Sequence, residues 1–176
     1  MPHLHTQPGQ HDHTVSIYLF RIDLDEPKVL LHMHRKLASY MPFGGHIELD
    51  ETPWQTIVHE LKEESGYDIN QVQLLQPHSR LHTLTNTSVH PIPFTYNTHP
   101  VPDNHFHTDS GHVVITRELP HQPPASGEST DLRLFTRAEI EAIPTDELFQ
   151  DVREIIAYLF DNILDTWQPV SPNQFG

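Results

Sequence analysis

The sequence predicts an α+β fold in which a mixed β-sheet lies between two helical layers. Segments rich in β-branched and aromatic residues recur along the chain, as is typical of strands. Residues 53–65 and 147–164 instead carry apolar residues at helical spacing. Strands, a helix, more strands and a final helix, in that order, favour one sheet covered on both faces. With 176 residues, the chain has room for one such core.

The N-terminal half begins with a predicted hairpin. Residues 15–21 and 29–34 carry the aliphatic and aromatic residues typical of strands, and an aspartate-rich turn sequence with a proline separates them. Residues 39–48 are predicted to run extended into a turn at Gly44 and Gly45, because glycine adopts backbone conformations closed to other residues.

Residues 53–65 are predicted to form the first helix. Thr52 and Pro53 are residue types favoured at the N-cap and the first helical position, and Gln55 completes a capping box with Thr52. Gly66 can take the left-handed conformation that ends a helix. The apolar stripe that would anchor this helix on a core consists of Trp54, Ile57, Val58 and Leu61.

The C-terminal half is predicted to alternate short strands with loops before a last helix. Strands are predicted at residues 72–75, 81–85, 105–119 and 132–135. Residues 86–104 contain four prolines and are predicted to form a long loop or an irregular edge in which residues 92–96 are extended. Residues 120–127 are predicted to be either a surface loop beside the functional site or a disordered one. Thr136 is expected to cap a short helix over residues 137–142, and the longest helix is predicted over residues 147–164.

We expect one domain with two short tails. Residues 1–12 are polar and rich in histidine, which predicts a flexible N-terminal tail, and residues 166–176 are predicted to form a C-terminal tail. The folded domain is therefore expected over residues 13–165.

Three glutamates of the first predicted helix, Glu60, Glu63 and Glu64, are spaced at i, i+3 and i+4. At about 100° per residue they share one helix face, where like charges repel one another. A bound cation would relieve this repulsion, and clustered carboxylates suit Mg²⁺ or Mn²⁺, which leave positions for water and substrate phosphate. A solvated acidic helix face is the alternative interpretation.

The residues around these glutamates resemble the Nudix box. That motif is a glycine, five residues, a glutamate, seven residues, and then Arg-Glu-aliphatic-any-Glu-Glu-any-Gly-aliphatic. Every spacing agrees, and the matching positions are Gly45, Glu51, Glu60, Leu61, Glu63, Glu64 and Gly66. The resemblance implies the Nudix-type α/β/α sandwich with a mixed β-sheet over about residues 13–165.

Two positions of the motif depart from the family pattern. His59 stands where the family has arginine, and Tyr67 replaces the closing aliphatic residue. A histidine has an ordinary pKa of about 6.5 and cannot form the two-pronged contact of a guanidinium. We therefore expect His59→Arg to keep or raise activity near pH 8, where an ordinary imidazole is neutral.

The resemblance also implies roles for the box residues. Glu60, Glu63 and Glu64 would ligate Mg²⁺ or Mn²⁺ together with the Gly45 carbonyl, and either Glu63 or Glu60 would activate the attacking water. Glu51 is expected to support the geometry of the loop and helix. Residues that bind the substrate are not identifiable from the sequence.

The function implied is metal-dependent hydrolysis of a nucleoside diphosphate linked to another group, or of a related small diphosphate. The alternative is a catalytically weak Nudix-fold module that binds or senses a nucleotide, and the replacement of arginine by His59 motivates it. Turnover at an appreciable rate distinguishes the two hypotheses.

The amino-acid composition restricts the binding partners and the cellular location that we expect for the protein. The formal charge is −14 with ten Lys and Arg residues, which argues against a nucleic-acid groove and leaves a small phosphorylated substrate. The absence of cysteine is compatible with a reducing compartment. Neither a classical secretion signal nor a membrane span is apparent, so a cytoplasmic protein is expected, while the oligomeric state is open.

Two further groups of residues are candidate ligands. His105, His107 and His112 could form a transition-metal site, although scattered surface or strand histidines are the favoured interpretation. Glu128 or Asp131 could supply a late acidic residue to the glutamate site, and an ordinary loop acid is an equally good interpretation.

Overall fold

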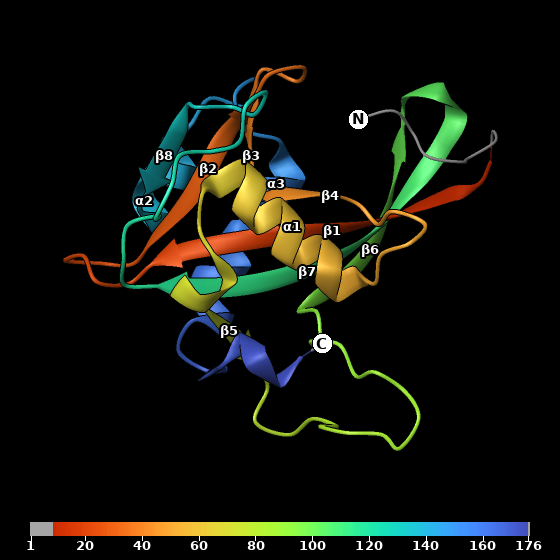
Figure 1. Cartoon of the computed structure of the whole chain (residues 1–176). Coiled ribbons are helices and arrows are strands. Elements are labelled where there is room, and N and C mark those ends of the chain that lie inside the picture. Colours follow the sequence, from red (N-terminus) through yellow and green to blue (C-terminus); the bar gives the residue numbers. More distant parts are fainter. Residues whose placement is uncertain (1–8, 176) are drawn as a thin grey trace.

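A mixed β-sheet with helices on both faces forms the centre of the molecule (Figure 1). The computed structural model describes residues 9–175, and nine strands of this part join the sheet. They are β1 (His11–Arg21), β2 (Lys28–His34), β3 (Ser39–Met41), β4 (Phe43–His46), β5 (Gln73–Gln76), β6 (Thr95–Val101), β7 (His105–Thr116), β8 (Leu132–Phe135) and β9 (Gln168–Val170). The main path runs β3-β2-β1-β7-β5-β9, while β4 pairs with β1, β6 with β7 and β8 with β2.

The two longest strands, β1 and β7, are parallel neighbours at the centre of the sheet. Because side chains alternate along a strand, β1 supplies both layers of the core. Val15 and Ile17 pack with helix α1 (Pro53–Ser65), whereas Tyr18 and Phe20 pack with helix α3 (Gln150–Tyr158). We call these two sides of the sheet the α1 face and the α3 face. The predicted mixed sheet between two helical layers is confirmed.

Helix α1 has the bounds that the sequence predicts. The Thr52 side chain accepts a hydrogen bond from the Gln55 N–H, and the Gln55 side chain accepts one from the Thr52 N–H, which completes the capping box. At the other end Gly66 has φ 77° and its N–H donates to the Lys62 carbonyl. A capping residue of this kind contributes about 1 kcal/mol to helix stability.

Of the two helices on the α3 face, one matches its predicted bounds and the other begins later than predicted. Helix α2 (Arg137–Ala142) has its predicted bounds and the predicted Thr136 cap. The last helix, predicted from residue 147, begins at Gln150, because a turn in which two N–H groups donate to the Pro144 carbonyl precedes it, and after Tyr158 it continues as a π-helix. In the described part of the chain, no helix combines the length and apolar character needed to cross a bilayer.

The segment predicted as a C-terminal tail is instead built into the fold. Strand β9 pairs antiparallel with β5, with Val170 opposite Leu74. Phe175 is buried, and its ring lies 5.4 Å from the ring of Trp54 in α1. This pairing depends on contacts with residues about one hundred positions earlier, which no local pattern near the C-terminus reveals.

One predicted strand, residues 81–85, does not form. This segment lies in the long loop that follows β5, and the side chains of Leu81 and Leu84 are 58% and 50% exposed. Strands β7 and β9 already occupy both edges of β5, so the segment has no free edge beside β5 to pair with.

Two further predictions near the N-terminus need correction. Strand β1 begins at His11, earlier than predicted, and residues 1–8 of the predicted tail lie outside the described part. Gly44 and Gly45 belong to β4 and do not form a turn. The close approach of β4 to β1 explains the glycine at position 44, where φ is 143° and a Cβ atom would lie 2.0 Å from the Val15 carbonyl oxygen.

Candidate functional site

The predicted metal-binding glutamates lie on α1 where its C-terminal half passes β4 and β2. Glu60 and Glu64 are buried, with 4% and 7% of their surfaces exposed. The Gly44 N–H donates a hydrogen bond of 2.8 Å to Glu64 Oε2. The other Glu64 oxygen lies 3.9 Å from His32 Nδ1, a buried nitrogen without a hydrogen-bond partner in the described residues.

Burial makes these two carboxyl groups unusually weak acids. It raises the pKa of Glu60 to about 7 and that of Glu64 to about 8, and neighbouring glutamates add to both shifts. Burial likewise lowers the pKa of His32 to about 4, so this imidazole is neutral at pH 7 and does not compensate the carboxylates. A cation bound beside the glutamates would provide that compensation.

His59 connects the two remaining carboxylates of the box. Its Nδ1 lies 3.2 Å from Glu51 and its Nε2 lies 3.2 Å from Glu63. Burial lowers the pKa of His59, but the carboxylates of Glu63, Glu60 and Glu51 outweigh that effect and the net shift is upward. The imidazole is thus better able to carry a positive charge than an unperturbed histidine, and it contacts two box carboxylates.

The three predicted ligands do not converge as a group. Glu63 is exposed and turned toward His59, whereas Glu60 and Glu64 are buried side chains. Within residues 9–175, the group of at least three ligand side chains whose atoms approach within 4.8 Å of one another is Asp12, His105 and His107. The glutamate site therefore has a buried pair and one exposed member.

The loop after β7 lies against the C-terminal end of α1, as the sequence prediction of a loop beside the site requires. The Ala125 N–H donates to the Glu63 carbonyl, and a Cβ atom on Gly66 would lie 1.9 Å from the Gln122 carbonyl oxygen. Arg35 of the β2–β3 connection donates to the carbonyls of Gly127 and Glu128.

The two candidate late acids, Glu128 and Asp131, lie in different surroundings. The charge of Glu128 contributes to the raised pKa values of Glu60 and Glu64, which places its carboxylate in the electrostatic neighbourhood of the site. Asp131 instead pairs with Arg133, with 2.9 Å between its Oδ1 and the arginine Nε. The sequence could not choose between them, because the choice depends on how the loop folds back.

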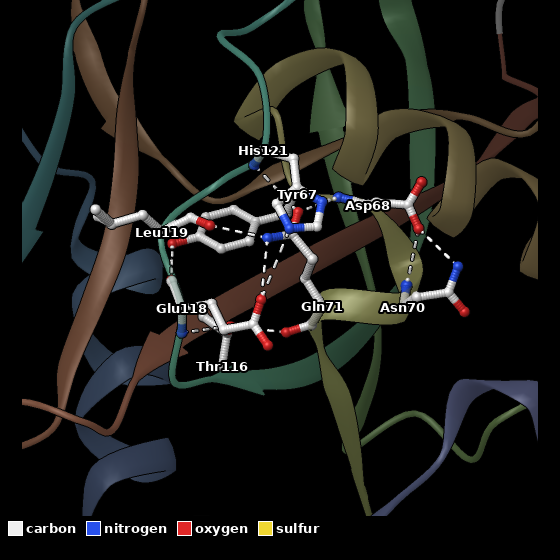
Figure 2. A network of polar contacts seen from close by, with 8 residues as sticks. All are labelled: Tyr67, Asp68, Asn70, Gln71, Thr116, Glu118, Leu119 and His121. Atoms are coloured by element: carbon white, nitrogen blue, oxygen red, sulfur yellow. Dashed lines mark hydrogen bonds and ion pairs between the residues drawn. The ribbon is translucent and has the colours of Figure 1, made fainter.

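Tyr67, the second departure from the motif, anchors the start of this loop (Figure 2). Its ring is buried and its hydroxyl donates to the Glu118 carbonyl at 2.8 Å. Gln71 donates to the Leu119 carbonyl at 2.8 Å, and its side-chain oxygen accepts from the His121 N–H. The tyrosine therefore fills an aliphatic position in the core while its polar end finds a partner.

The predicted histidine group is divided between the two faces of the sheet. His105 and His107 share the α3 face with Val113, whereas His112 points to the α1 face. There His112 lines a cavity of about 390 Å³ between the N-terminal end of α1 and the segment that contains His90 and Tyr96. No glutamate of the box lines this cavity.

Comparison with known proteins gives a consistent assignment. The sequence profile of the NUDIX domain matches residues 11–159. A NUDIX-family hydrolase from Clostridium perfringens has a similar structure, with a TM-score of 0.70 and 27% identity over 85% of this chain and 96% of that one. Among curated protein sequences, none matches significantly.

Two more distant structures share the fold. The binary complex of a C. elegans Ap4A hydrolase has a TM-score of 0.62 with 14% identity and covers 85% of this chain and 98% of that one. The NUDIX domain of Shewanella oneidensis NrtR, complexed with ADP ribose, has a TM-score of 0.59 with 17% identity and covers 89% of each chain.

The chain belongs to the NUDIX domain family. It is an enzyme of the Nudix pyrophosphohydrolase type, which acts on phosphoric anhydrides. The resemblance of the segment from Gly45 to Tyr67 is therefore confirmed as family membership.

Proposed function

We propose that the chain hydrolyses a nucleoside diphosphate linked to another group, or a related small diphosphate, at the glutamate site of α1. The burial of Glu60 and Glu64 carries this proposal. Two carboxyl groups whose pKa values are raised to about 7 and 8 are unfavourable as a charged pair, and a divalent cation makes their ionised forms favourable.

The donor set fits Mg²⁺ or Mn²⁺. Carboxylate oxygens are the ligands that these ions prefer, and the chain has no cysteine that could supply a thiolate. Glu60 and Glu64 would hold the ion, with Glu63 and the Gly45 carbonyl completing the set. The hydrogen bond from the Gly44 N–H fixes Glu64 in the orientation seen in the structure.

The chemistry is divided among the residues of the box. When bound, the divalent ion polarises the phosphates and lowers the pKa of a coordinated water. Glu63 is the exposed member of the cluster and would accept the proton of the attacking water, with Glu60 as the alternative base. His59 orients Glu63 through its Nε2, while its Nδ1 contacts Glu51.

Small nucleotides are the substrates that best fit the remaining observations. Related structures include an Ap4A hydrolase and a domain complexed with ADP ribose. Both of these nucleotides, Ap4A and ADP ribose, contain phosphoric anhydride linkages. The formal charge of −14 disfavours a polymeric nucleic acid, whereas divalent ions held by the glutamates would reverse the field locally for a small phosphorylated molecule. We further infer a cytoplasmic location, where such nucleotides occur.

The test is an assay of product release across nucleoside triphosphates, dinucleoside polyphosphates, nucleotide sugars and ADP-ribose. We expect turnover of at least one diphosphate-linked nucleoside, dependent on Mg²⁺ or Mn²⁺ and abolished by excess chelator. Metal-dependent binding without turnover of any of these compounds would contradict the proposal and favour a sensing module.

A further inference from the structure

A second group of ligand-type side chains lies on the opposite side of the sheet from α1. Asp12 in β1 is paired with His107 in the parallel strand β7, and His105 lies two residues earlier in β7. His46 in β4 is paired with Thr14, two residues after Asp12. Paired and alternate residues point to the same side of a sheet, so three strands bring these four side chains to the α3 face.

The ligand atoms of Asp12, His105 and His107 all lie within 4.8 Å of one another, and His46 adjoins Asp12 and His107. Asp12 Oδ2 lies 3.6 Å from His105 Nε2 and 3.7 Å from His46 Nε2, and the Nε2 atoms of His46 and His107 are 3.1 Å apart. Bonds of about 2.0–2.1 Å to a tetrahedral ion place its ligand atoms about 3.3–3.4 Å from one another. One of the observed separations, 3.1 Å, is shorter than that value, and the other two, 3.6 and 3.7 Å, are longer.

The cluster is withdrawn from solvent. His105 is 3% exposed and Asp12 is 8% exposed, and the side chain of His46 is 11% exposed. Because the protein limits solvent access here, a metal ion at this place would be held by these side chains.

We propose that Asp12, His46, His105 and His107 form a binding site for a divalent transition ion of the Zn²⁺ class. Three imidazoles and one carboxylate suit such an ion better than Mg²⁺, which prefers oxygen ligands. Four protein ligands close the coordination shell, as in structural sites. The ion would therefore join the starts of β1 and β7 to the end of β4, and this proposal does not rest on the proposed hydrolysis.

The test uses the full chain freed of metal by a chelator and then titrated with Zn²⁺ alone or Co²⁺ alone. Asp12→Asn and His107→Asn remove one ligand each, and His82→Asn, on an exposed loop, is the matched control for a histidine far from the cluster. Glu60→Gln/Glu64→Gln removes the glutamate site, so that binding there is recognised separately. Calorimetry gives the affinity, and the visible spectrum of Co²⁺ gives the coordination geometry.

We expect one tight Zn²⁺ equivalent and an intense tetrahedral Co²⁺ spectrum in the wild-type chain, in His82→Asn and in the double glutamine variant. Asp12→Asn and His107→Asn should bind Zn²⁺ at least about 100-fold more weakly. Unchanged affinity in both variants would overturn the proposal. If either variant fails to fold, the wild-type spectrum decides, because an octahedral or absent Co²⁺ spectrum shows that the four side chains form only a hydrogen-bonded cluster.

Discussion

The two faces of the sheet gather ligand-type side chains of different chemistry. On the α1 face, Glu60 and Glu64 are buried carboxyl groups whose pKa values are raised, and Glu63 reaches solvent. On the α3 face, the Asp12 carboxylate lies among the imidazoles of His46, His105 and His107. The first arrangement suits a hard ion with open positions for a substrate, and the second suits a softer ion held entirely by protein. One sheet can thus separate a catalytic from a structural metal site.

Removing a carboxylate from the α1 face should have the largest effect. We expect Glu64→Gln and Glu63→Gln each to lower kcat by at least about 100-fold, because each removes a metal ligand or the base while keeping the shape of the side chain. Steady-state kinetics on the best nucleotide substrate, with circular dichroism to confirm folding, measures this. Glu154→Gln, an exposed position on α3, is the control. Activity that survives both changes, or excess chelator, would refute the assignment.

The raised pKa values also predict how the metal-free protein responds to pH. Glu60 and Glu64 are ionised in the unfolded chain above about pH 5 but bind protons in the folded protein up to about pH 7 and 8. The folded state therefore holds more protons, and its stability falls as pH rises through these values. Between pH 7 and 8.5 we expect the free energy of unfolding to drop by about 1–2 kcal/mol.

Denaturant unfolding in chelator measures this drop, and the double variant Glu60→Gln/Glu64→Gln should lack it. The buried histidines do not produce it, because a lowered pKa such as that of His32 changes stability at lower pH and in the opposite direction. Mg²⁺ should remove the drop in the wild-type chain. Equal pH dependence in the wild-type and the double variant would show that these carboxyl groups are not the source.

A smaller effect is expected at His59. Because its imidazole contacts Glu51 and Glu63, His59→Gln should reduce kcat several-fold, while His59→Arg should keep or raise activity near pH 8. The wild-type enzyme should approach the His59→Gln level as pH rises through the raised pKa of His59 and its charge is lost. Rate–pH profiles of the three proteins test this. A loss of activity in a folded His59→Arg protein would give the imidazole a role that a guanidinium cannot fill.

We expect no binding of the protein to nucleic acids. A chain with ten Lys and Arg residues and a formal charge of −14 lacks the cationic cluster that neutralises successive phosphates. Gel-shift titrations with duplex DNA and single-stranded RNA at physiological salt should therefore show no retention. Sub-micromolar binding to either one would mean that a polymeric substrate has to be considered.

The two faces differ in how far the sequence could predict them. The residues of α1 and its box are close in sequence, so helical spacing and the caps at Thr52 and Gly66 were sufficient to predict its bounds. The histidine cluster draws on Asp12, His46 and β7, and only the register between strands shows which of these residues meet. Strand β9 escaped prediction for the same reason, because its pairing partner is distant in the chain.

The sequence also could not predict which member of a local group is buried. Helical spacing placed Glu60, Glu63 and Glu64 on one arc, but only the structure shows that Glu60 and Glu64 are buried, Glu64 beside the Gly44 N–H, while Glu63 reaches solvent. Likewise, a histidine in place of arginine indicated a weaker contact, and only the positions of Glu51 and Glu63 show that both of its nitrogens face carboxylates.

A crossed metal titration tests the division between the two faces most directly. Mn²⁺ binding is followed by electron paramagnetic resonance and Co²⁺ binding by visible absorption in the wild-type chain, in Glu60→Gln/Glu64→Gln and in Asp12→Asn. We predict that the glutamine variant loses Mn²⁺ binding but keeps the tetrahedral Co²⁺ spectrum, and that Asp12→Asn does the reverse. Loss of both metals in the same variant, or Mn²⁺ binding that survives without Glu60 and Glu64, would contradict the account.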